Sequence, residues 1–310
     1  MSKLPKFIIF VKITDMKKGN KEYQLLTIES ILAILNKINY SAERMIVHGS
    51  FAINLDMISN KVPSSLVKSI MIPFYIKDNR IIRILSGSAT MEFNLTEYKL
   101  NAGDIIIVRE GTCIEFKEIS DDASAEAMVF VPDKYPTNLT HTNEPVIHIH
   151  PSSLEWNEIG HLFYTIYSFA LSPEYRRDII EPLVQALVNC ILEINQKSSE
   201  TTEVKSSVIF DRFINELNTC GTKKQPVTYY ADKLCITPQY LSRIVSQVSG
   251  KPVTDWINKA VILNARILLR DSSKTVSEIA ELLNFPNDSF FCRFFKRETG
   301  QTPTQYRKKS

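Results

Sequence analysis

The feature that most constrains this chain is a unit that is written twice between Val227 and Tyr306. Positions of the first copy return in the second at an offset of 49 residues before a turn and 50 after it, with Pro286 as the added residue. The pairs are Ala231 and Ala280, Leu234 and Leu283, Ile236 and Phe285, Arg243 and Arg293, Gly250 and Gly300, and Trp256 and Tyr306. Such a repeat predicts two copies of one small structural unit.

Each copy has the pattern of two short helices joined by a tight turn. In the first, Thr237 is an expected N-cap with Pro238 behind it, and Gly250 is an expected C-cap. In the second, Asn287 and Gly300 take these places. Apolar residues at spacings of three and four predict core packing rather than base stacking, even for the phenylalanines. The expected core positions are Leu241, Ile244, Val245 and Val248 in the first copy, and Phe290, Phe291, Phe294 and Phe295 in the second.

The opposite faces of these two helices are polar, and a helix of this kind fits the major groove of DNA. Arg243 and Arg293 stand at matching positions, where each could bind a guanine edge or a phosphate. Lys296 and Arg297 are expected to contact phosphates. For the remaining candidates a solvated face is the competing interpretation. The candidate DNA-binding residues are Gln239, Ser242, Arg243, Ser246, Asp288, Ser289, Arg293, Lys296 and Arg297.

A long amphipathic stretch from Thr254 to Leu269 separates the two units. A helix of about 16 residues spans ~24 Å, which can hold two recognition helices in successive major grooves ~34 Å apart. Charge agrees with this placement. Residues 205–310 contain 17 Lys and Arg against 9 Asp and Glu, whereas residues 1–204 contain 20 against 25. Only the C-terminal third is therefore suited to a polyanion such as double-stranded DNA.

The earlier part of the chain predicts a second domain of a different class. Between Phe51 and Pro132, short β-like runs alternate with turn signals, which is typical of a sandwich or barrel. Two apolar helical stripes follow within 153–197 and predict an antiparallel hairpin. The serine- and threonine-rich segment 198–207 reads as a linker, and Leu25–Ile38 as a further helix. The fold class is thus α+β, with domains 1–197 and 208–310 and a first helix of the second domain over Val208–Leu217.

Cysteines, apolar runs and histidines indicate the compartment of the protein and whether it binds a metal. Five cysteines without Cys-x-x-Cys spacing favour reduced thiols, and the apolar run Phe7–Val11 is cut short by Lys12, so no secretion signal is expected. No stretch approaches the ~20 apolar residues of a spanning helix. We therefore expect a cytoplasmic protein with no membrane partner. His148 and His150 alternate as two metal ligands on a strand would, but without a third ligand nearby we expect no metal site.

The repeat resembles the DNA-binding domain of the AraC/XylS family of bacterial transcription regulators. The resemblance lies in ITPQYLSRIVSQVSGKPVTDWI and VSEIAELLNFPNDSFFCRFFKRETGQTPTQYR, and covers about the last 100 residues. It implies seven helices, two of them recognition helices, behind a sensing or dimerising domain. Val261 departs from the family pattern, where an arginine is frequent.

The N-terminal half is similar to a cupin-type domain, through Gly103-Asp104 before an apolar run and Gly111 after it. Metal cupins would have a proline at Arg109 and a histidine at Ile114. Both are absent, and the His-x-His-x-Glu cluster of the other metal motif is missing from Gly87 to Glu97, so we expect no catalytic metal site; no cofactor is expected.

These observations predict a sequence-specific transcription regulator, controlled by a small-molecule effector in the N-terminal β-domain. The alternative is an effector-independent regulator, whose first domain serves only dimerisation or a protein partner. An enzyme is not expected, because the phosphate-loop, nucleophile-turn and paired metal motifs are missing. Expected partners are double-stranded DNA, an effector of unknown identity and a second copy of the chain, with RNA polymerase as a further candidate. Activation and repression both remain open.

Overall fold

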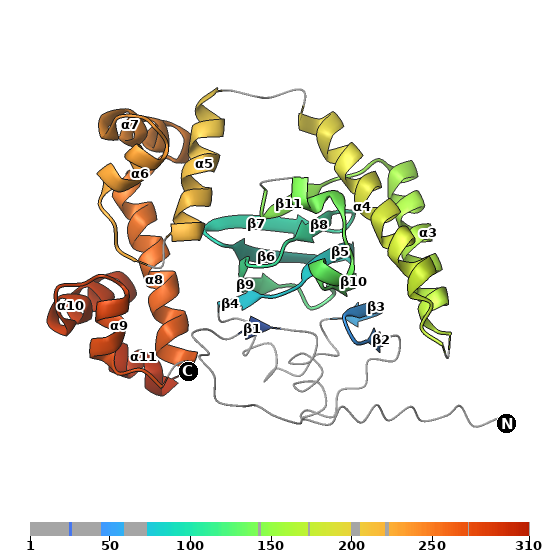
Figure 1. The fold of residues 1–310 in the computed structure, drawn as a ribbon, viewed down its shortest axis with the longest axis horizontal. Coiled ribbons are helices and arrows are strands. Elements are labelled where there is room, and N and C mark those ends of the chain that lie inside the picture. Colours follow the sequence, from blue (N-terminus) through green and yellow to red (C-terminus); the bar gives the residue numbers. More distant parts are fainter. Residues whose placement is uncertain are drawn as a thin grey trace.

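The computed structural model describes residues 25–26, 45–58, 73–141, 144–172, 174–199, 205–220, 223–271 and 273–309. Within these ranges a β-domain stands between two groups of helices (Figure 1). Its strands are β1 (Leu25–Leu26), β2 (Met45–His48), β3 (Phe51–Ile58), β4 (Phe74–Ile76), β5 (Asn79–Ser86), β6 (Ser88–Phe93), β7 (Thr96–Asn101), β8 (Ile105–Val108), β9 (Cys113–Ile119), β10 (Ser124–Phe130) and β11 (Val146–Ile149).

The strands form two sheets, which agrees with the expected sandwich or barrel. Sheet A has the order β1-β4-β9-β6-β7, and sheet B has the order β11-β8-β5-β10-β3-β2. Strand β8 shows why the sheets stack. Its four residues are all buried, with Ile106 and Val108 in the apolar cluster shared with sheet A, and Ile105 and Ile107 in the cluster under the helices. Because side chains alternate along a strand, one short apolar run serves both faces of sheet B.

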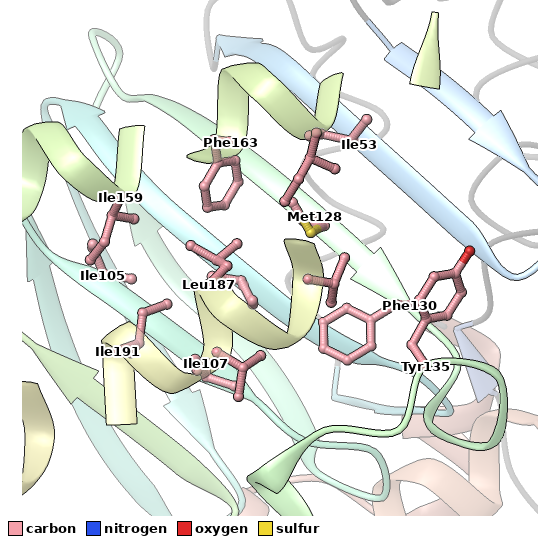
Figure 2. Packing of buried hydrophobic residues seen from close by; sticks show 14 of the residues in the cluster. Ile53, Ile105, Ile107, Met128, Phe130, Tyr135, Ile159, Phe163, Leu187 and Ile191 are labelled. Atoms are coloured by element: carbon pink, nitrogen blue, oxygen red, sulfur yellow. The ribbon is translucent and has the colours of Figure 1, made fainter. Parts of the chain in front are cut away.

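Helices α3 (Ser153–Ala170) and α4 (Arg177–Ser199) cover the outer face of sheet B and form the expected hairpin. Ser152 and Glu155 make a capping box that starts α3. Figure 2 shows the layer beneath these helices, where Ile105 and Ile107 of β8 meet Phe163 of α3 and Leu187 and Ile191 of α4.

Seven helices lie in the described residues from 205 onward, as the resemblance implied. They are α5 (Lys205–Cys220), α6 (Val227–Lys233), α7 (Pro238–Ser249), α8 (Val253–Asp271), α9 (Val276–Leu282), α10 (Asp288–Thr299) and α11 (Pro303–Lys309). The long helix between the repeats is therefore α8, slightly longer than predicted. Among the described residues, none of the helices is both long and apolar enough to cross a membrane.

Two expected boundaries differ from the structure. The predicted linker 198–207 overlaps two helices, because α4 continues to Ser199 and α5 begins at Lys205, while residues 200–204 lie outside the described ranges. A polar composition does not interrupt a helix that is supported by charge pairs, and Lys197 pairs with Glu193 at 2.7 Å, one turn earlier. The helix predicted over Leu25–Ile38 is wrong at its start. Leu25 and Leu26 pair in parallel with Tyr75 and Ile76 of β4, where the sheet edge supplies backbone partners; residues 27–38 lie outside the described ranges.

Candidate nucleic-acid interface

The turn inside each repeat has the same backbone geometry. Cys235 and Asn284 occupy equivalent positions and both have positive φ, 56° and 62°. The amide that follows each of them donates to the carbonyl five residues earlier, at 3.0 Å from Ile236 to Ala231 and at 2.9 Å from Phe285 to Ala280. A non-glycine residue pays strain to adopt this conformation, so its recurrence marks one turn built twice.

The second helix of each unit, α7 or α10, is capped in the same way at both ends. The side chain of Thr237 accepts from the amide of Tyr240 at 3.2 Å, and that of Asn287 from the amide of Phe290 at 3.0 Å. At the other end Gly250 and Gly300 adopt the left-handed conformation, with φ of 68° and 78°. These caps confirm the predicted bounds of both recognition helices.

The two units fill their cores with different side chains. The aliphatic Leu241 and Val245 of α7 pack with α5, α6 and α8, in a cluster that also contains Leu95 and Cys113 of the β-domain. Phe291, Phe294 and Phe295 of α10 pack with α8, α9 and Tyr306 of α11, in a cluster confined to the C-terminal domain. Equivalent backbones are thus supported by unlike cores.

The predicted DNA-binding residues lie on the outer faces of these two helices. Eight of the nine are exposed; Ser242 is half-buried, and its hydroxyl donates to the carbonyl of Pro238 at 2.8 Å within its own helix. Its side chain is therefore less available than predicted. Arg297 forms an ion pair with the adjacent Glu298 at 2.5 Å, so a phosphate would have to compete with this carboxylate.

Two residues predicted to be in the core are not. Phe290 is 51% exposed, and Val248, in the last turn of α7, is 41% exposed. At about 100° of rotation per residue, Phe290 lies about 40° outside the arc from Phe294 to Phe295, at the edge of the buried stripe. Its ring instead lies beneath Arg293, whose guanidinium carbon is 4.7 Å from the ring centroid. Arg243 stands over Tyr240 in the same way at 5.1 Å.

The side of α8 that faces away from the repeats is docked against the outer face of sheet A. Successive side chains of a strand point to opposite faces of the sheet. On the outer face of sheet A, β4, β6 and β9 direct Tyr75, Glu92 and Glu115 toward α8. Arg266 donates two hydrogen bonds to Glu115, at 2.8 and 3.1 Å. The hydroxyl of Tyr75 donates to Asn264 at 2.9 Å.

Lys259 completes this contact at the N-terminal half of α8. Its ammonium group donates to the carbonyl of Leu95 at 2.7 Å and lies 3.2 Å from Glu92. Burial alone raises the pKa of Glu115, but the hydrogen bonds and charges of Arg266 and Lys117 outweigh it and lower that pKa. Glu115 is therefore held as a carboxylate. Sequence reasoning missed this contact, although the alternation of charged and apolar residues along β9 is a signal that its outer face meets polar groups.

The histidine pair at the end of β11, His148 within the strand and His150 directly after it, has a structural partner. Asp104 lies 3.2 Å from Nε2 of His148 and 2.9 Å from Nδ1 of His150. Burial raises the pKa of Asp104, but the hydrogen bonds from the Asn101 amide and both histidines lower it overall. Within the described ranges, no three ligating side chains are arranged to hold a metal ion. Of the positions compared with metal cupins, Ile114 is buried between the sheets and Arg109 is hydrogen-bonded to the carbonyl of Glu144.

Comparison with known proteins agrees with the geometry of the repeat. Residues 230–309 match a family described as "Helix-turn-helix domain", and this is a domain of the AraC type. Residues 230–309 are thus a helix-turn-helix domain of the AraC type. It is 25% identical over 58% of its length to the uncharacterized HTH-type transcriptional regulator YpdC of Escherichia coli (strain K12), and the match spans 65% of YpdC, less than two thirds.

Two further proteins are similar to parts of this chain. The HTH-type transcriptional activator RhaR of Enterobacter sp. (strain 638) is 21% identical over 74% of this chain and 84% of its own length. Among solved structures, the C-terminal domain of AraT, a response regulator from Geobacillus stearothermophilus, is 26% identical, covering 33% of this chain and 85% of that domain with a TM-score of 0.32.

Proposed function

We propose that this protein is a sequence-specific transcription regulator that places α7 and α10 in successive major grooves of one DNA duplex. The observation that carries the proposal is the pair of matched turns, which present two polar recognition helices on either side of α8. Helix α8 has 19 residues and spans about 28 Å at 1.5 Å per residue. This is close to the ~34 Å between successive turns of the groove.

Within this proposal the two helices have unequal roles. The exposed cations Lys296 and Arg297 of α10 would bind phosphates, whereas the equivalent positions of α7 are the neutral Ser246 and Gln247. Arg243 and Gln239 would contribute proportionally more to base readout. Ser242, Ser246, Asp288, Ser289 and Arg293 complete the proposed interface.

The test is selection of a binding site from random duplexes with the purified full-length chain. We expect enrichment of one sequence with two half-sites about one helical turn apart. The double variant Arg243→Ala, Arg293→Ala should lose this preference, while the matched double variant Lys77→Ala, Lys99→Ala in the β-domain should retain it. Absence of any enriched sequence with the wild-type chain would contradict the proposed function.

We further propose that residues 1–197 form a sensing domain, that an effector bound there controls DNA binding, and that residues 208–310 form the DNA-binding domain. The contact between sheet A and α8 supports this control, because α8 also sets the separation of the two recognition helices. A thermal-shift screen of the full chain against sugars and other small metabolites tests it, since a ligand of the native state raises the melting temperature. If no tested metabolite alters stability or DNA affinity, the effector-independent alternative is favoured.

The proposed assembly is a homodimer formed through residues 1–197. RNA polymerase remains a candidate partner at the promoter. Helix α3 supports dimerisation, because the large apolar residues Leu154 and Tyr164 within it and Leu171 at its C-cap are exposed. Light scattering at tens of micromolar should give twice the mass of the chain. Tyr164→Lys should shift this toward the monomer, whereas Lys99→Ala should not; a monomeric wild type would contradict the proposal.

A further inference from the structure

We infer that Tyr240 and Phe290 are positioning residues for DNA readout: each ring holds the guanidinium three residues later in the orientation that a base edge requires. The inference rests on the proposed function and names a further pair of residues that serve it. It starts from the aromatic–arginine pair at the same place in both repeats, with centroid distances of 5.1 Å in α7 and 4.7 Å in α10.

Both rings are anchored from the backbone side. The amides of Tyr240 and Phe290 receive the N-cap hydrogen bonds of Thr237 and Asn287, so their main chains are fixed at the start of each recognition helix. Residues three apart lie on the same side of a helix, and the long side chain of the arginine therefore reaches back over the ring. Cap, ring and guanidinium form one local arrangement, which occurs twice.

Arg243 and Arg293 differ from two other arginines of this domain because no carboxylate in the described part of the chain pairs with them. Arg266 and Arg297 are paired with Glu115 and Glu298. Among the described residues, neither Arg243 nor Arg293 has an ion pair, and each is exposed. An aromatic face attracts the guanidinium plane without occupying its N–H groups, which remain free at the edge. A carboxylate, by contrast, would use those donors.

The exposure of Phe290 also agrees with a role outside the core. About half of its surface meets solvent, while Phe291 and Phe295 beside it are fully buried. An arginine side chain loses considerable rotamer entropy when it binds, and a group that restricts it beforehand reduces that loss. The ring thus raises affinity for the correct base without contacting DNA itself.

A double-mutant cycle between Phe290 and Arg293 in the full-length chain tests the inference, with the site selected by the wild type as probe. Phe290→Ala should weaken binding to this site by about two- to fivefold, the range of an exposed cation–π contact, and leave affinity for random duplexes and the salt slope unchanged. In the Arg293→Ala background the same change should have no further effect. Phe290→Tyr should restore binding.

Controls separate this from other outcomes. Leu282→Ala removes another exposed apolar side chain of this unit, from α9 rather than from the recognition helix, and should leave affinity unchanged. Melting temperatures identify any variant that loses the fold, and Tyr240→Ala with Arg243→Ala repeats the cycle in α7. An equal loss from Phe290→Ala with and without Arg293 would overturn the inference and place the ring on the DNA itself. If the wild type selects no site at all, the proposed function fails instead.

Discussion

The two helix-turn-helix units share a backbone but differ in how each is attached to the molecule. The first unit packs in one cluster with Leu95 and Cys113, so its core is continuous with the β-domain. The second unit packs against α8 and α11 in a cluster that contains residues of the C-terminal domain only. Burial raises the pKa of the Cys113 thiol, which is therefore neutral in this apolar contact.

This difference separates two tasks within one repeated motif. The caps and the turn geometry are the same in both units, although α7 contributes aliphatic side chains to its core and α10 contributes phenylalanines. The first unit shares its apolar core with the β-domain, and Arg243 is the one charged candidate on its outer face. The second unit meets the β-domain through Arg266, which bridges Tyr306 and Glu115, and carries more cations on its outer face. We therefore expect regulation to act first on base readout by α7, while α10 maintains the charge contact.

The largest effect should come from cutting the attachment itself. Glu115→Gln leaves Arg266 without its carboxylate at a largely buried contact, and should lower the free energy of unfolding by about 2–3 kcal/mol. Chemical denaturation of the full chain measures this. Glu118→Gln on the same strand is exposed and should have almost no effect. Equal, small effects of both changes would show that the ion pair does not hold α8.

The same contact should respond to acid. Because the folded pKa of Glu115 is lowered from its ordinary 4.5, its contribution to stability is complete above pH 4.5 and is lost as pH falls through the folded value. The difference in unfolding free energy between wild type and Glu115→Gln should therefore shrink below pH 4.5. A difference that is constant down to pH 3 would contradict this assignment.

A second comparison truncates the two side chains at matching positions of α10, where they are cations, and of α7, where they are neutral. Lys296→Ala with Arg297→Ala should weaken binding to selected and random DNA alike, and reduce the slope of log affinity against log salt by up to about two units. The equivalent change in α7, Ser246→Ala with Gln247→Ala, should leave the slope unaltered. Binding titrations at several salt concentrations would distinguish these outcomes; equal slopes for both double variants would mean that the charge asymmetry has no role.

For base readout we expect the opposite asymmetry, with larger effects from substitutions in α7 than in α10. Gln239→Ala or Arg243→Ala should cost about 1–3 kcal/mol on the selected site, with random DNA unaffected and base preference relaxed in one half-site. Ser289→Ala, at the position equivalent to Gln239, should cost less. Competition binding against single-base variants of the site provides the measurement. Equal losses on random DNA would assign these residues to phosphates instead.

The smallest expected effect distinguishes the first helices of the two units. Thr275 and Glu278 form a capping box on α9, whereas α6 begins after Pro226 without any side-chain cap. Thr275→Ala should lower the unfolding free energy by about 1 kcal/mol. Thr228→Ala, in the first turn of α6, should change it by less. Thermal unfolding would test the pair, and a neutral Thr275→Ala would show that packing alone holds α9.

Local interactions explain why the C-terminal domain could be predicted from sequence. Thr237, Asn287, Gly250 and Gly300 act within a turn of their own position, so their residue types were sufficient. Long-range contacts could not be read in this way. The exposure of Phe290 depends on which arc of α10 the other helices cover, and the strand at Leu25 depends on a free edge of β4.

The residues of the candidate interface show the same contrast between local patterns, which the sequence reveals, and long-range contacts, which it does not. Most candidates of α7 and α10 were placed correctly on the outer face, because helical periodicity determines direction. The rings beneath the arginines and the docking of α8 were missed. Pairing of Glu115 with Arg266 joins residues 151 positions apart, and no local pattern specifies such a partner.

Because ion pairs hold α8 against sheet A, salt would weaken this contact within the chain as well as the contacts between the chain and DNA. Mobile ions screen exposed charge pairs more than buried ones, over a distance of about 8 Å at physiological strength. Lys259 with Glu92 is the more open pair and would weaken first, whereas Arg266 with Glu115 is better protected. Part of any salt dependence measured for DNA binding would then arise within the chain. Counting phosphates from that slope requires Lys259→Ala as a reference, since this variant lacks the more open of the two pairs.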